Sequence, residues 1–299
     1  MKKKIIISIV IVELIAVIVL AFVFLNARNS VAGAITGEFL SFPSPGGGYQ
    51  YYYEHLPDVI IGKDTFGKSV YNINSDTLNS VKDYSVQKPA NTYRIITLGD
   101  SWTFGLYVNT EDNWPSVLER KLNSTCKGKN YEVINLAVEG YDTAYSLERY
   151  RRRGTKYKPD LVLWMHVDMF RYMEAILPSI NKITSPKDGE RRWKQGMDSL
   201  FKKYSHEELF YIQEAKMKKI RDYYKGKLGF VLSSTVGTYK GELHKLVKKI
   251  NGFSVDLPEL KSDAIVKGDT HPNKKGQAII AETVFSDLLH NKRIPCKLN

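Results

Sequence analysis

The sequence predicts an α/β protein, a three-layer α/β/α sandwich in which helices cover both faces of a parallel sheet. From residue 93 onward, short apolar runs alternate with amphipathic segments, which is the pattern of successive strand-helix-strand units. The run at 159–165 is apolar throughout, as expected for a parallel strand that is buried on both faces. A chain of 299 residues is long enough for one such domain with attached segments.

The elements of this domain are predicted in chain order from the period of their apolar residues. Strands are expected at 93–98, 131–136, 159–165, 228–232 and 253–255. Helices are expected at 114–122, 205–224, 242–250 and 272–289. The second of these helices begins with a capping box, Ser205 and Glu208. Residues 169–205 form an insertion, rich in basic residues and containing Trp193, which we expect to be a lid over the site.

The N-terminal segment is predicted to anchor the chain in a membrane. Lysines at positions 2–4 precede residues 5–25, an apolar run of 21 residues that is interrupted only by Ser8 and Glu13. This run is long enough to span a bilayer, and the lysines favour a cytoplasmic tail, residues 1–4, with the remainder translocated. A cleaved signal peptide is the alternative, because residues 32–34 read AGA, but this candidate cleavage site lies well beyond the apolar run.

Residues 26–88 are predicted to form a stalk followed by an irregular cap on the domain. They contain Pro43 and Pro45, a run of three glycines and a tyrosine cluster at 49–53, with little periodic pattern. The tyrosines could stack on sugar rings, but a place at the membrane interface or in a small core is more typical of such clusters.

The formal net charge of the chain is +12, which raises the question of anionic binding partners. Residues 169–227 contain 14 Lys and Arg against 8 Asp and Glu, so this region carries about half of the excess. A basic surface on an anchored domain would suit anionic lipid headgroups or acidic wall polymers, whereas a solvated basic face is the simpler interpretation. No nucleic-acid-binding motif is present, so we expect no nucleic acid partner.

A single serine stands on the turn that follows the first predicted strand. Residues 99–105 read GDSWTFG and come directly after the apolar run that ends at Leu98. Glycine on both sides permits a tight turn and the close approach of a substrate. Because such a turn lies at the carboxyl edge of a parallel sheet, where ligands bind, we expect Ser101 to be a nucleophile.

A second motif, DTHPN at 269–273, opens the last predicted helix. Together the two motifs resemble the first and last sequence blocks of the SGNH hydrolase superfamily, whose first block has the form GDSxTxG. The resemblance identifies 89–299 as an SGNH hydrolase-like catalytic domain and implies a flavodoxin-like order of its parallel strands. It implies that Ser101 attacks an ester, that His271 takes its proton and that Asp269 orients the imidazole, without any metal or other cofactor.

The resemblance also implies an oxyanion hole, and here the chain departs from the family. Two of the expected donors are the backbone N–H groups of Ser101 and of Gly140, which lies in the loop after the second predicted strand. The third is the asparagine of a Gly-x-Asn-Asp block, and aligning its aspartate with Asp168 places Val167 at the asparagine position. Valine donates no hydrogen bond, so His166 or a loop residue must substitute, or one donor is missing.

Three functions follow from these motifs. The first is a membrane-anchored, extracytoplasmic serine esterase that removes O-acyl groups, with O-acetyl groups of cell-surface polysaccharide as the leading substrate. The second is a lysophospholipase or acyltransferase that acts on lipid, which the basic insertion and the bilayer would suit. The third is a non-catalytic glycan-binding or assembly protein, because Val167 removes a donor.

The two cysteines, Cys126 and Cys296, are predicted to form a disulfide. In a sheet of flavodoxin-like order the first and last helices lie on the same face and run toward the same edge. Each cysteine follows one of these helices by a few residues, so both should emerge together at the end of the domain that is remote from the site. A translocated domain is in an oxidising compartment, where such a pair forms a disulfide.

Overall fold

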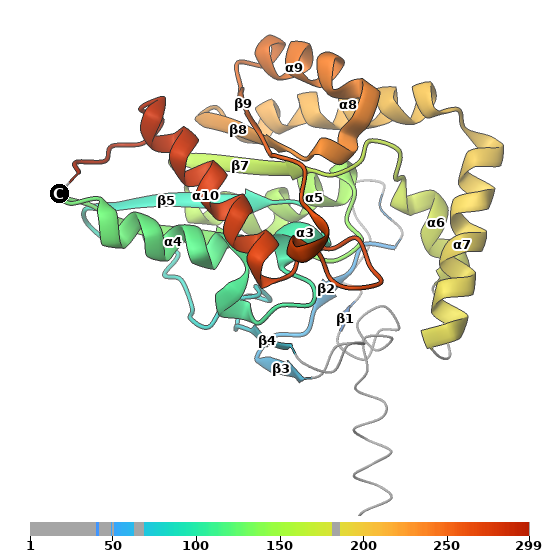
Figure 1. The fold of residues 1–299 in the computed structure, drawn as a ribbon, viewed down its shortest axis with the longest axis horizontal. Helices are drawn as coiled ribbons and strands as arrows, with labels where there is room; N and C mark the ends of the chain where they lie inside the picture. Colours follow the sequence, from blue (N-terminus) through green and yellow to red (C-terminus); the bar gives the residue numbers. More distant parts are fainter. Residues whose placement is uncertain (1–39, 42–48, 50, 63–68, 181–185, 299) are drawn as a thin grey trace, which may run out of the picture.

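A wholly parallel, five-stranded sheet forms the centre of the fold (Figure 1). The computed structural model describes residues 40–41, 49, 51–62, 69–180 and 186–298. The strands lie in the order β6-β5-β7-β8-β9, which is the flavodoxin-like order. Their bounds are β5 (Thr92–Leu98), β6 (Asn130–Asn135), β7 (Leu161–His166), β8 (Lys227–Leu232) and β9 (Phe253–Asp256).

Helices cover both faces of this sheet, as the alternating pattern predicts (Figure 1). One face packs against α4 (Trp114–Thr125) and α10 (Lys274–His290). The other packs against α5 (Thr143–Arg149), α8 (His206–Tyr223) and α9 (Lys240–Lys249). The remaining short helical turns are η1 (Thr110–Asp112), η2 (Tyr150–Gly154), η3 (Thr155–Tyr157), η4 (Ser234–Tyr239) and η5 (Ser262–Ala264).

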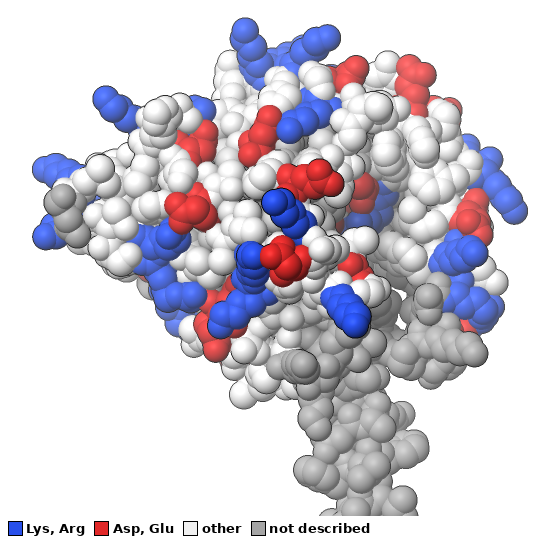
Figure 2. Space-filling model, in the orientation of Figure 1, with Lys and Arg blue, Asp and Glu red and all other residues white. Residues whose placement is uncertain are grey.

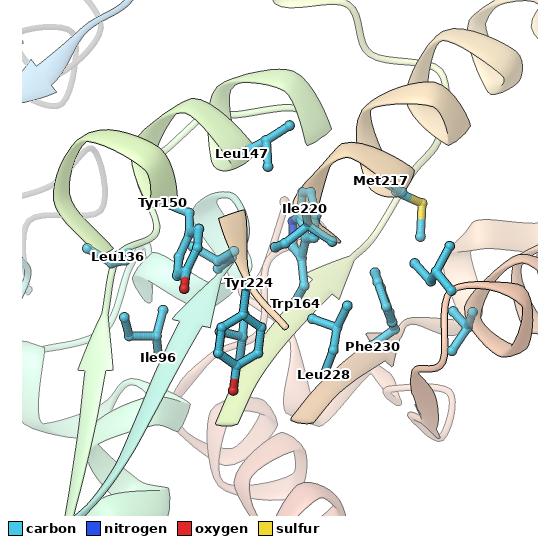
Figure 3. Close-up of a cluster of buried hydrophobic side chains, with 14 of the residues drawn as sticks. Ile96, Leu136, Leu147, Tyr150, Trp164, Met217, Ile220, Tyr224, Leu228 and Phe230 are labelled. Carbon is cyan, nitrogen blue, oxygen red and sulfur yellow. The ribbon is translucent and has the colours of Figure 1, made fainter. Parts of the chain in front are cut away.

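Side chains of the central strands alternate between two buried clusters. In β7, Val162 and Trp164 join the cluster below α5 and α8, where Figure 3 shows Ile220 of α8 close to Trp164. Leu161 and Leu163 point to the opposite face and pack with α4 and α10. Both faces are therefore apolar, which explains why the strand reads as a continuous apolar run in the sequence.

The described part of the predicted cap consists of two antiparallel strand pairs. These are β1 (Leu40–Ser41) with β2 (Glu54–His55), and β3 (Val59–Gly62) with β4 (Val70–Ile73). Tyr49, Tyr52 and Tyr53 are buried and pack against tyrosines of the sheet domain, so the interpretation of the tyrosine cluster as a small core is confirmed.

The predicted cytoplasmic tail and signal anchor, 1–25, lie outside the described residues, as do residues 26–39 of the predicted stalk and cap. Among the residues that the structure describes, no helix combines the length and apolar character that a membrane span requires.

The predicted insertion folds into two helices, α6 (Met173–Ile180) and α7 (Pro186–Lys203), which lie side by side beyond one end of the sheet (Figure 1). Met173 and Leu200 are buried and join the tyrosine core of the cap. The insertion is thus fixed to the cap through an apolar contact, and its role as a lid stays a prediction.

Charged side chains of both signs are interspersed on the face shown in Figure 2. Surface ion pairs among the described residues include Arg191 with Asp188 on α7 and Lys121 with Glu282 between α4 and α10. The positive side chains in these pairs are therefore locally compensated, as on an ordinary solvated surface.

Cys126 and Cys296 form a disulfide, as predicted, with their Cα atoms 4.9 Å apart. Cys126 ends α4, and the last residues of the chain pass beside it, where the backbone N–H of Lys127 donates to the carbonyl of Lys297. The bond therefore ties the C-terminal tail to the loop before β6.

Replacing both cysteines by alanine is expected to lower the free energy of unfolding by about 3–5 kcal/mol, because the bond closes a long loop in the unfolded chain. The two residues are 170 positions apart. Urea unfolding of the wild type and the Cys126→Ala/Cys296→Ala variant measures this difference. Reductant should destabilise the wild type and leave the double variant unchanged; equal stability of the two oxidised proteins would contradict the prediction.

Candidate active site

Ser101 occupies the first position of α3 (Ser101–Phe104), directly after the end of β5. A Cβ on Gly99 would lie 2.4 Å from the Thr103 hydroxyl and 3.3 Å from Cβ of Met165, so only glycine fits between strand and helix. Asp100 caps α3 by accepting a hydrogen bond of 3.0 Å from the Trp102 N–H. The turn thus presents the serine at the carboxyl end of β5.

His271 lies beside this serine, with Nε2 2.7 Å from Ser101 Oγ. Its Nδ1 contacts Asp269 Oδ1, and its backbone N–H donates to the same oxygen at 2.8 Å. The structure therefore brings the three predicted triad residues together, although 170 positions separate serine and histidine. The double contact to Oδ1 explains how an aspartate only two residues before the histidine can orient its ring.

The loop that carries His271 is fixed by backbone hydrogen bonds. Val266 donates to the His271 carbonyl at 2.9 Å, and Asp269 donates to the Val266 carbonyl at 3.0 Å. Asn273 caps α10 and its side-chain amide also donates to the carbonyl of Ile265 at 2.8 Å. The DTHPN motif therefore closes a tight loop and starts the helix behind it.

Two further contacts hold the imidazole and its carboxylate partner. Tyr107 meets the His271 ring edge to face at 5.3 Å. Partial burial alone would raise the pKa of the Asp269 carboxyl, but hydrogen bonds from His271 and its charge lower that pKa below the usual value. Asp269 is thus ionised at neutral pH and can accept a hydrogen bond from the His271 ring.

Gln277 of α10 connects the histidine segment to the serine segment. It is fully buried, its amide nitrogen donates to the Trp102 carbonyl at 3.0 Å, and its amide oxygen accepts from the Trp114 N–H at 2.9 Å. One side chain therefore fixes the register of α10 against both α3 and α4. The sequence did not single it out, because a buried glutamine on a helix has no local motif.

Gly140 lies in the loop between β6 and α5, at the same edge of the sheet. Its φ of +78° is in the left-handed region that favours glycine. Ser101 is the first residue of α3, so its backbone N–H has no hydrogen-bond acceptor within the helix. The donor roles of both N–H groups stay predictions.

Val167 follows β7, and its carbonyl accepts a hydrogen bond from the Thr235 hydroxyl. His166 is buried, its ring packs against those of Trp164 and Phe230, and it lines a cavity of about 20 Å³. Burial lowers the pKa of His166 to about 3, so its ring is neutral. Neither Ser101 nor Gly140 lines that cavity, and direct substitution of the missing donor by His166 stays a prediction.

Arg171 joins three segments of the site and was missed from the sequence. Its guanidinium pairs with Asp168 at 2.6 Å and with Asp100 at 3.2 Å, and it donates to the Tyr141 carbonyl at 3.4 Å. It also lies 6.0 Å from the centre of the Trp193 ring. The insertion therefore supplies a cation that links the serine turn, the glycine loop and the end of β7. The only indication of this role in the sequence was that Arg171 lies three residues after Asp168, a spacing at which the two side chains can pair.

Burial raises the pKa of two carboxyl groups near Arg171, those of Asp142 and Asp100. Burial raises the pKa of Asp142 to about 6, although hydrogen bonds from the Met173 and Tyr145 N–H groups oppose this shift. Burial also raises the pKa of Asp100, against the opposing charge of Arg171. Such perturbed groups gather at functional sites more often than elsewhere.

No family model and no curated protein matches this chain. Solved structures similar to it include the psychrotrophic esterase EstA from Pseudoalteromonas sp. inhibited by monoethylphosphonate, at 18% identity and a TM-score of 0.42, covering 68% of this chain and 100% of that one. A catalytic mutant of Axe2, an acetylxylan esterase from Geobacillus stearothermophilus, has 16% identity and a TM-score of 0.43, covering 68% and 96%. A family two carbohydrate esterase from Clostridium thermocellum, in complex with cellohexaose, has 13% identity and a TM-score of 0.44, covering 71% and 68%.

Proposed function

We propose that this protein is a serine ester hydrolase. The observation that carries the proposal is the chain of contacts from Ser101 Oγ through the His271 ring to the Asp269 carboxylate. A nucleophile, a base within hydrogen-bond reach and a third group that orients the base are the parts that acyl transfer requires.

The geometry supports a two-step reaction. Ser101 Oγ attacks the ester carbonyl carbon while its proton passes to His271 Nε2, and Asp269 stabilises the imidazolium that forms. The protonated His271 then donates to the leaving alcohol as the C–O bond breaks, which leaves an acyl-serine. Water, deprotonated by the same histidine, hydrolyses this intermediate and restores the free hydroxyl.

Negative charge that develops on the carbonyl oxygen would be stabilised by the backbone N–H groups of Ser101 and Gly140. Val167 stands where the resemblance places an asparagine, so a third, side-chain donor is absent from that position. The site would then work with two donors or receive a third from a neighbouring group.

Val167→Asn is therefore expected to raise kcat for a short ester, by up to about tenfold to a hundredfold, because loss of one such donor elsewhere costs roughly 10²–10³. Steady-state kinetics of the purified variant measures the effect, with Val167→Leu as a control that adds volume but no donor. An unchanged or lower kcat in a folded Val167→Asn protein would mean that another group already fills the position.

We infer that the acyl group is small, with acetyl as the leading candidate. The groups beside the serine turn are polar, among them Asp100, Asp142 and Arg171, and they line a cavity of about 20 Å³. Ser101 does not line this cavity, so its size does not limit the acyl chain, and the ester series described below decides the acyl length.

The proposed setting is the outer side of a membrane, with residues 5–25 as the anchor. The disulfide between Cys126 and Cys296 supports this, since such bonds persist in extracytoplasmic compartments. The substrate proposed for an enzyme in this place is an O-acetylated cell-surface polysaccharide.

Hydrolysis of p-nitrophenyl acetate, butyrate and decanoate by the full chain tests these proposals together. The expected result is a kcat/KM that falls steeply with acyl length, together with release of acetate from O-acetylated xylan. A preference for decanoate would favour the lipid-directed alternative. Absence of hydrolysis with every ester would favour the non-catalytic binding alternative that Val167 suggests.

A further inference from the structure

We propose that Tyr53 and His55, two residues of the N-terminal cap, are positioning residues for the loop that carries Gly140. The proposal rests on the ester hydrolysis proposed above, in which the Gly140 N–H stabilises the oxyanion. It assigns the cap, which the sequence marks only as irregular, a part in the reaction.

Tyr53 holds the backbone on one side of Gly140. Its hydroxyl donates to the Glu139 carbonyl at 2.6 Å, which belongs to the peptide unit whose N–H is that of Gly140. A Cβ added to Gly140 would lie 2.8 Å from the same hydroxyl, so the glycine and the tyrosine are in close contact. On the other side of the glycine, the Tyr141 hydroxyl donates to the Tyr53 carbonyl. The orientation of the proposed oxyanion N–H is therefore fixed from the cap.

His55 joins this loop to the helix that carries the nucleophile. Its Nε2 lies 2.7 Å from the Glu139 carboxylate, and its ring stacks on Phe104, the last residue of α3, at 5.0 Å. The His55 side chain is only 1% exposed. One rigid ring thus contacts both segments that supply an oxyanion donor, the turn of Ser101 and the loop of Gly140.

The ion pairs of Glu54 connect the cap to the domain outside this loop and provide a contrast. Glu54 pairs with Arg149 and Arg153, and Tyr52 donates to Glu54, so these residues join the cap to α5 and η2. A cap that served only to cover the core would need no polar contacts to residues 139–141. Tyr53 instead contacts the residues on both sides of the glycine, and His55 holds the Glu139 side chain, which matches the need to keep an N–H group in a fixed orientation.

Tyr53→Phe removes one hydroxyl and keeps the ring. Without this hydroxyl the Gly140 N–H is no longer held in the orientation that stabilises the negative charge on the carbonyl oxygen in the transition state. We therefore expect kcat for p-nitrophenyl acetate to fall about tenfold to a hundredfold, while KM changes less than twofold. The matched control is Tyr131→Phe, since Tyr131 is likewise a buried tyrosine that donates to a backbone carbonyl, that of Pro295, at the opposite end of the sheet. The control should lower the melting temperature by a similar amount and leave kcat within twofold.

The role of His55 is tested by comparing a substitution that keeps a side-chain N–H with one that removes it. His55→Gln keeps a side-chain N–H near the position of Nε2, whereas His55→Leu removes it. We expect His55→Gln to retain a kcat several-fold higher than that of His55→Leu, measured per folded protein by circular dichroism and active-site titration.

Ser101→Ala is assayed in parallel to separate the two proposals. If wild-type activity survives Ser101→Ala, the proposed function fails. If Ser101→Ala is inactive but Tyr53→Phe keeps the wild-type kcat, or Tyr131→Phe lowers kcat equally, the positioning role is overturned while the hydrolase mechanism stands.

Discussion

Ser101→Ala is expected to lower kcat for p-nitrophenyl acetate by about 10⁴-fold or more, because it removes the only atom that can form the acyl-enzyme in the proposed mechanism. The change deletes one hydroxyl at the start of α3, whose cap is made by Asp100, so the fold should persist. Steady-state kinetics and thermal unfolding of the same preparation measure both quantities.

His271→Ala should be almost as severe, and the double variant should be no worse than either single variant, because serine and histidine act as one unit. His244→Ala is a suitable control, since this histidine lies on α9 and pairs with Asp256 on the surface. Independent, multiplicative losses at Ser101 and His271 would contradict a shared proton-transfer step.

Glu54→Gln is expected to lower the free energy of unfolding by about 3–5 kcal/mol at pH 7, since it leaves a buried arginine without its charge partner. The Arg149 side chain is 0% exposed and its guanidinium lies 3.0 Å from the Glu54 carboxylate, which also pairs with Arg153 at 2.6 Å. Urea unfolding measures the loss. Glu282→Gln, which breaks an exposed pair with Lys121, should cost less than about 1 kcal/mol.

The ion pair between Glu54 and Arg149 also predicts how the free energy of unfolding depends on pH. Burial alone would raise the pKa of Glu54, but Arg149 and Arg153 lower it to about 2, from a usual value of 4.5. Between these pH values the unfolded chain binds more protons than the folded one. The ionised Glu54 carboxylate therefore makes its full contribution to the free energy of unfolding above pH 4.5, and this contribution is lost as the pH falls toward 2. The stability difference between wild type and Glu54→Gln should therefore shrink over this range. A difference that is constant with pH would contradict the assignment.

Periodicity predicted the sheet domain well because its strands and most of its helices carry simple patterns. The strands are buried on both faces, and α4 and α8 each present one apolar side. Helix α5 was not predicted, and its burial explains why. All seven residues of Thr143–Arg149 are buried, so polar and apolar positions show no alternation between core and solvent.

The three predicted triad residues lie together because each of the two motifs determines a local turn. The order of the parallel strands then brings both turns to the carboxyl edge of the sheet. What the sequence could not give was the set of contacts made between remote segments. Arg171, Gln277 and His55 have no motif of their own, and their roles depend on partners far away in the chain. The cap was predicted as an irregular cover for the same reason.

Covalent labelling by a phosphonate ester tests the central claim most directly. A p-nitrophenyl phosphonate should transfer its phosphonyl group to Ser101 Oγ with release of p-nitrophenolate, since the tetrahedral adduct resembles the proposed intermediate. Mass spectrometry of the treated chain should show one adduct, located on the peptide that contains Ser101 and formed far more slowly in His271→Ala. A chain that stays unlabelled, or that carries the adduct on another residue, would contradict the account of Ser101 as the activated nucleophile.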